Sequence, residues 1–117
     1  MLMFKIFSVA NYPPEKFDLE DQLNKFVSQR TVVITNISQS SGKVGNAYVT
    51  TVTLAYHPRS HMEQGSKPGG SKARVIFGTR SCVEEALRRL EKPEVCHMAQ
   101  SEYYQEQESY MVVTIID

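Results

Sequence analysis

The sequence predicts an α+β protein built from two βαββ halves. Strand-like apolar runs and two amphipathic helix patterns alternate along the 117 residues. The order of these signals before residues 57–72 returns after them, and that stretch is rich in glycine, proline and polar side chains. One antiparallel sheet with both helices on one face would bury the apolar side of every element. We therefore expect one domain, residues 1–117, with half-repeats 1–56 and 73–117 and a flexible loop at 57–72.

The composition is that of a folded domain, with 41% hydrophobic and 22% charged residues. A formal net charge of zero argues against a protein that coats nucleic acid by bulk charge. The two cysteines, Cys82 and Cys96, form neither a CxxC motif nor a disulfide framework. No apolar run approaches the ~18 residues that span a membrane. We expect a cytoplasmic protein.

The first half begins with an apolar run at residues 3–9. Both faces of this predicted strand carry apolar side chains, which favours a position inside the sheet rather than at its edge. Asp18 is the expected N-cap of the first helix, and its apolar stripe consists of Leu19, Leu23, Phe26 and Val27. Residues 31–37 and 48–56 are rich in β-branched side chains and predict a hairpin closed by the turn material between them.

The second half repeats this order. Residues 73–78 predict a strand in which Ile76-Phe77 takes the place of Ile6-Phe7. Ser81 and Glu84 form a predicted capping box at the start of the second helix, which ends before Pro93.

The end of the chain predicts a closing hairpin. Residues 95–99 form a strand, residues 100–109 a polar turn or long hairpin end, and residues 110–116 the last strand. This last run matches residues 48–54 position for position, with a tyrosine leading each. It is apolar on both faces, so we expect deeper burial there.

The predicted sheet lacks a cover on one side. Two helices barely cover one face of six strands, and tyrosines and threonines line part of the other face. Burial against another copy would cover it, so we expect a homo-oligomer.

Each half resembles the dodecin-type βαββ unit. In the first half the likeness rests on residues 4–7, 18–23 and 38–52, and in the second on residues 75–79 and 83–87. The chain also looks like small single-domain accessory proteins of bacilli and their phages, and a phage origin would imply that it acts in the host cytoplasm. These resemblances imply assembly through the sheets and an accessory or anti-defence role rather than an enzyme. Dodecins stack flavin on a tryptophan, and this chain has none, so no cofactor is expected.

Basic residues in and after residues 57–72 form the predicted ligand site. Arginine recognises phosphate bidentately and tyrosine can stack a base. The leading hypothesis is a non-catalytic, oligomeric binding protein that captures a nucleotide-like anion, for example a host signalling nucleotide. An ordinary solvated loop is the alternative reading. The candidate ligand-binding residues are Tyr56, Arg59, Lys67, Lys72, Arg74 and Arg80.

The alternative function is a protein-interaction module, either a steric inhibitor of a host protein or an assembly piece. Its predicted contact surface is acidic and tyrosine-rich, because tyrosines among acids can imitate nucleic acid to a basic partner. The candidate partner-binding residues are Glu102, Tyr103, Tyr104, Glu106 and Glu108.

A third hypothesis is a phosphodiesterase that uses His57, His61 or His97. Pro58 prevents a helix from placing the first two histidines on one face. The sequence predicts no metal site, and no pattern assigns a catalytic residue.

Overall fold

The computed structural model describes residues 2–11, 17–29, 32–58, 72–90, 97–105 and 108–117. Its first half contains β1 (Met3–Asn11), α1 (Phe17–Val27), β2 (Val32–Val44) and β3 (Ala47–Pro58). The second half contains β4 (Ala73–Thr79), α2 (Arg80–Arg88), β5 (His97–Gln105) and β6 (Glu108–Ile116). The α+β class is confirmed, and both halves have the element order βαββ.

The six strands form two antiparallel sheets of three strands, not one sheet of six as predicted. The strand orders are β1-β3-β2 and β4-β6-β5, so the last strand of each half lies in the middle of its sheet. The outer edge of β4 is not paired with a strand of the first sheet, and α1 side chains hydrogen bond to its backbone instead. Asn24 and Glu20 of α1 bind Ala73 and Val75 of β4 in this way.

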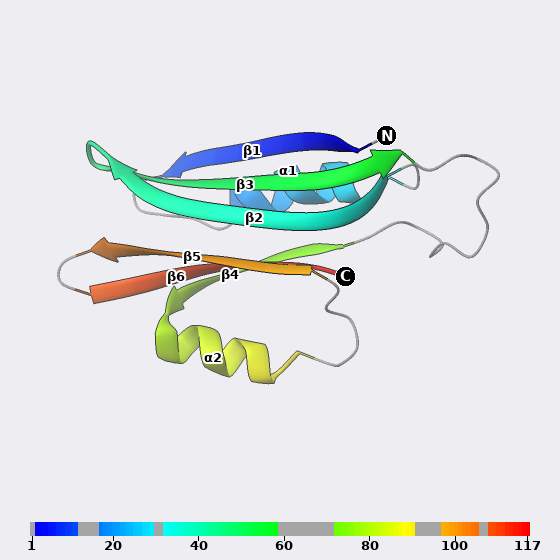
Figure 1. Ribbon diagram of the computed structural model, residues 1–117. Coiled ribbons are helices and arrows are strands. Elements are labelled where there is room, and N and C mark those ends of the chain that lie inside the picture. Colours follow the sequence, from blue (N-terminus) through cyan, green and yellow to red (C-terminus); the bar gives the residue numbers. More distant parts are fainter. Residues whose placement is uncertain (1, 12–16, 30–31, 59–71, 91–96, 106–107) are drawn as a thin grey trace.

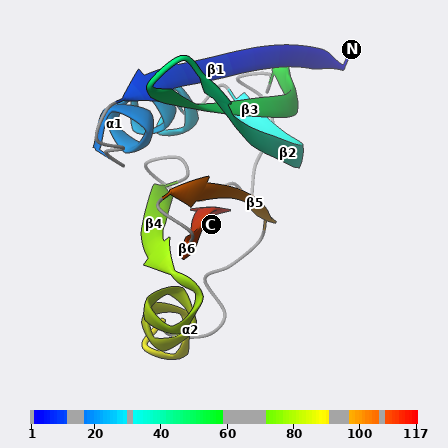
Figure 2. The same cartoon turned by 90° about the vertical axis from the view of Figure 1, so that its left-hand side faces the viewer.

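The sheets and helices are stacked in a fixed order (Figures 1 and 2). The first sheet lies at the top of both views. Beneath it, α1 and the second sheet lie side by side, and α2 lies on the far side of the second sheet. Each helix therefore covers the corresponding face of its own sheet. The helix-free face of the second sheet packs against the first half, whereas neither described helix covers the outer face of the first sheet.

One hydrophobic core runs through both halves. Leu23 of α1 and Val52 of β3 are fully buried together with Val75 of β4 and Ile116 of β6. A smaller cluster around Val83 lies between α2 and the second sheet. Residues 112–116 are all buried, because β6 has a covered face on each side. This confirms the predicted deep burial of the last strand.

The first strand lies at a sheet edge, so its predicted central position is wrong. Phe7 faces α1, where its ring lies 5.7 Å from that of Phe26. Side chains alternate along a strand, and Phe4 and Ile6 therefore point to the helix-free face, where each is 64% exposed. Apolar residues on both faces of this strand do not signal a central position here.

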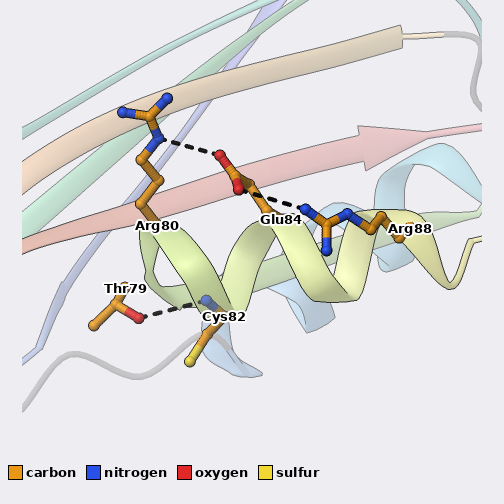
Figure 3. A network of polar contacts seen from close by, with 5 residues as sticks. All are labelled: Thr79, Arg80, Cys82, Glu84 and Arg88. Carbon is orange, nitrogen blue, oxygen red and sulfur yellow. Dashed lines mark hydrogen bonds and ion pairs between the residues drawn. The ribbon is translucent and has the colours of Figure 1, made fainter.

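The start of α2 also differs from the prediction. The N-cap is Thr79, whose side-chain oxygen accepts a hydrogen bond from the Cys82 backbone amide at 3.4 Å (Figure 3). Glu84 does not close a capping box with Ser81 but pairs with Arg80 one turn earlier. The helix thus begins at Arg80, directly after β4.

Both hairpins are present. β5 extends to Gln105, so of the two predicted alternatives the long hairpin end is correct and residues 100–105 are strand rather than turn. In the first hairpin Gly45 has φ +60°, a left-handed conformation that glycine adopts without strain.

Candidate functional site

A pocket of about 400 Å³ lies between α2 and β5. Val83, Leu87 and Met111 are its buried or half-buried apolar lining residues. The remaining lining residues are polar and exposed, namely Arg80, Glu84, Gln100 and Glu102. We call this surface the α2–β5 pocket. It has an apolar floor and a polar rim.

The pocket exists because α2 covers only part of its sheet. The helix packs over Ile76 of β4 and over Val113 and Ile115 of β6, while β5 lies beyond it. Two large apolar side chains on this face of β5 are consequently exposed, Met98 to 52% and Tyr104 to 71%. The alternating residues of β5 therefore form one wall of an open groove.

Charge on the helix wall of the pocket is mixed (Figure 3). Glu84 lies between two arginines, with Oε1 3.1 Å from Arg80 Nε and Oε2 3.8 Å from Arg88 Nη2. All three side chains are about half exposed or more, so these pairs contribute little to stability and can exchange partners readily. Glu102 adds a second carboxylate on the facing strand.

A cluster of aromatic rings packs between the sheets near the two hairpins. The Tyr103 ring lies 4.5 Å from that of Tyr48 and is stacked at 5.7 Å on Phe77 and at 5.6 Å on Tyr110. Tyr103 is only 5% exposed. No hydrogen-bond partner is found for its buried hydroxyl in the described part of the chain. Burial, and then the neighbouring tyrosines, raise the pKa of Tyr103 above its ordinary value, so it stays neutral.

The predicted partner-binding residues separate into two groups. Glu102 and Tyr104 are exposed on the α2 side of β5, whereas Tyr103 points the other way into the core. Glu108 is exposed and accepts a hydrogen bond from the Tyr110 hydroxyl at 3.1 Å. Glu106 lies outside the described residues. Only Glu102 and Tyr104 thus belong to the surface around the pocket.

Among the predicted ligand-binding residues that the structure describes, Arg80 is separated from Lys72 and Arg74. Tyr56 packs edge-on against Phe26, 4.9 Å away, and is half-buried. Lys72 and Arg74 stand at the start of β4 and Arg80 follows its end, about 20 Å along a seven-residue strand. Arg59 and Lys67 lie outside the described residues.

The structure describes two of the three histidines of the phosphodiesterase hypothesis. His57 lies near the end of β3 and His97 at the start of β5, in different sheets, and His61 is outside the described residues. Over the described ranges, no three His, Cys, Asp or Glu side chains are grouped so that they could hold a metal ion.

Comparison with known proteins supplies no relative. No protein-family model matches the chain, and no curated protein or solved structure matches it. Among the described helices, none has the length and apolar character needed to cross a membrane.

Three residues of this surface, Met98, Gln100 and Met111, were not singled out from the sequence. Residues 100–109 were interpreted as a polar turn or long hairpin end, so no strand was assigned to residues 100–105. Met98, Gln100 and Glu102 are large side chains separated by the small Ala99 and Ser101, and this period of two was the signal that could have revealed the strand.

Proposed function

We propose that this protein is a non-catalytic protein-interaction module that binds its partner at the α2–β5 pocket. The observation that carries the proposal is the exposure of Met98 and Tyr104 beside an apolar floor. Protein interfaces combine an apolar centre with a polar rim and are enriched in tyrosine, methionine and arginine. The pocket combines these features at one place, with Met111 in the floor and Arg80 at the rim.

The charges of the pocket favour a protein surface over an anionic ligand. Arg80 is opposed by Glu84 and Glu102, so the rim carries more negative than positive charge. A phosphate would be repelled by these carboxylates, whereas backbone amides and hydroxyl groups of a protein could donate to them. Capture of a nucleotide-like ligand stays a prediction for the residues around Arg59 and Lys67, which the structure does not describe.

Site-specific photo-crosslinking tests the proposal. Tyr104 would be replaced by the photoreactive residue p-benzoylphenylalanine in the full-length chain, and cells producing it would be irradiated. We expect covalent adducts to protein, because Tyr104 is 71% exposed beside the pocket. The matched position is Arg89, which is exposed and paired with Glu85 at 3.1 Å, apart from the pocket lining.

The two positions give a clear decision. Adducts from position 104 with none from position 89 support an interaction surface at the pocket. Equal labelling at both positions would mean random collision, and no protein adduct at position 104 would remove the basis of the proposal.

A further inference from the structure

The groove between α1 and β2 in the first half is filled by strands of the second half. The Glu20 carboxylate accepts a hydrogen bond from the Val75 backbone amide at 3.0 Å. The Asn24 side chain accepts from the Ala73 amide at 2.8 Å and donates to the Ala73 carbonyl at 2.9 Å. These contacts close the outer edge of β4, whose backbone groups would otherwise lack partners.

Gln39 supplies the contacts on the β2 side of this groove. Its Nε2 donates to the Val112 carbonyl and to Ser101 Oγ, both at 2.9 Å. Its Oε1 accepts a hydrogen bond from Thr114 Oγ1. Ser41 and Ser101 share a further hydrogen bond through their hydroxyl groups. Gln39 thus joins the two sheets through hydrogen bonds to a serine and a threonine.

The hairpins of the two halves correspond at a constant sequence shift. β2 ends at Val44 and β3 begins at Ala47, whereas β5 ends at Gln105 and β6 begins at Glu108, a difference of 61 positions for both bounds. Because both sheets also have the same strand order, residues of the two hairpins that are 61 positions apart occupy the same place in their sheets. The predicted match of residues 110–116 with residues 48–54 is thus off by one position.

The strand registers support this correspondence. Val52 lies between Phe7 and Gln39 in the first sheet. Val113, 61 positions later, lies between Ile76 and Gln100 in the second sheet. Both valines are fully buried on the helix-bearing face.

The positions that correspond to Gln39, Ser101 and Thr114 carry the same residue types, and they lie on two open surfaces. Gln100 takes the place of Gln39, and it lines the α2–β5 pocket. Ser40 and Thr53 take the places of the serine and the threonine, on the helix-free face of the first sheet. Each surface thus resembles one of the two faces that already pack together between the halves of the chain, and the two surfaces are complementary in the same way.

The helices repeat the remaining contact. Glu20 directly follows the buried Leu19 of α1, and Glu84 directly follows the buried Val83 of α2. Glu20 binds the edge of β4, whereas Glu84 lines the open pocket and is held by exposed arginines. The strand that corresponds to β4 is β1, an edge strand on which Phe4 and Ile6 are exposed.

We propose that copies of this protein associate head to tail, with the helix-free face of the first sheet of one copy seated in the α2–β5 pocket of the next. Gln100 then binds Ser40 and Thr53 of the second copy, and Glu84 accepts from the backbone edge of its β1. This inference rests on the proposed function, because it names the occupant of the same pocket. The contact continues the stacking of the two halves beyond the end of the chain.

Such a contact joins two different surfaces, so each copy keeps one of each kind free. Head-to-tail contacts produce open filaments, or rings if the rotation between copies closes. Burial of Phe4 and Ile6 supplies the apolar driving force. The exposed pairs of Glu84 with Arg80 and Arg88 must open, at little cost.

Two variants, each blocking one surface, test the proposal by sedimentation velocity of the purified full-length chain. Ile6→Glu places a charge on the sheet face, and Gln100→Arg places a longer charged side chain at the pocket. We expect the unaltered chain to form larger species as concentration rises, and each variant alone to be monomeric. An equimolar mixture should form a dimer and nothing larger, because one intact surface of each kind remains.

Gln22→Arg is the matched control, since it makes the same change at an exposed position of α1 and should leave assembly intact. At a concentration low enough for the unaltered chain to be monomeric, circular dichroism and thermal unfolding of all variants should match it, since assembly by itself raises the melting temperature. A pocket variant that still dimerises alone would show a contact between like faces and overturn the proposal, as would an unaltered chain that stays monomeric at its highest soluble concentration. In that last case crosslinked adducts to a different protein would leave the proposed function standing, and their absence would remove both.

Discussion

The groove beside α1 and the groove beside α2 are built from corresponding elements, but only the first is filled by other strands of the described chain. The first is filled by β4 and β6, and its polar groups on Glu20 and Gln39 are hydrogen bonded to the second half. The second has the same residue types at Glu84 and Gln100, yet it is open on the described surface. A helix that covers only two strands of a three-stranded sheet leaves a groove that another sheet can fill.

The difference shows that the same arrangement of a helix on a three-stranded sheet can form either a closed core or an exposed surface. Leu23 on α1 is fully buried because the second half closes over it, whereas Leu87 on α2 is only half-buried. Nothing within either helix decides this outcome. The position of each half in the stack decides it, so matched substitutions in the two halves should have unequal effects.

The largest expected effect is on the helix leucines. Leu23→Ala should lower the free energy of unfolding by about 3 kcal/mol, because a cavity forms in a closed core. Leu87→Ala should cost about 1–2 kcal/mol, since solvent already reaches its side chain. Urea unfolding of both variants at low protein concentration measures the two losses. Equal losses would mean that the α2 groove is closed as tightly as the α1 groove.

The next effect separates the two glutamines. Gln39→Ala should destabilise the fold by about 2 kcal/mol, because the fully buried Thr114 hydroxyl and the Val112 carbonyl lose their partner. Gln100→Ala should change stability by less than about 0.5 kcal/mol, as expected for an exposed residue. The same urea titration compares them. A large loss for Gln100→Ala in the monomer would contradict the open pocket.

The smallest effect concerns the tyrosine between the sheets. Tyr103→Phe should raise the free energy of unfolding by about 1 kcal/mol, because it removes a buried hydroxyl for which the described structure shows no partner. Tyr104→Phe, at an exposed position of the same strand, should change nothing. If Tyr104→Phe stabilised the fold as much, the hydroxyl of Tyr103 would not be the cause.

The pKa of Tyr103 extends this test to high pH. The folded chain holds the tyrosine proton more tightly than the unfolded chain, because burial raises the pKa of Tyr103. The stabilisation of the folded chain that comes from this difference in pKa is therefore fully present below about pH 10, where the unfolded tyrosine titrates. It is lost as the pH rises further. Thermal unfolding from pH 8 to 11 should show a smaller loss of stability for Tyr103→Phe.

Local patterns were sufficient to identify most elements from the sequence. The β-branched runs predicted the first hairpin, and the stripe of Leu19, Leu23 and Val27 predicted α1. Local patterns located the second helix as well, although its N-cap is Thr79 and not Ser81. These signals depend on neighbours within a few residues, which is why they can be read without the fold.

The candidate site was predicted only in part for the same reason. Glu102 and Tyr104 were singled out by composition, and both lie beside the pocket or line it. Gln100 was placed in a polar turn or long hairpin end and not in a defined strand, because a polar residue in an exposed strand lacks the apolar alternation that marks a half-buried one. Met111 reaches the pocket floor only through the pairing of β6 with β5.

The sequence by itself determined the order and type of the elements, whereas the tertiary structure decided which faces meet. Ile76-Phe77 was matched to Ile6-Phe7, but Phe7 packs against α1 while Phe77 lies on the helix-free side and Ile76 faces α2. A shift of one residue along a strand exchanges its two faces. Alternation of apolar side chains fixes the period of a strand, but only contact with the other sheet and the helix selects which side is inward.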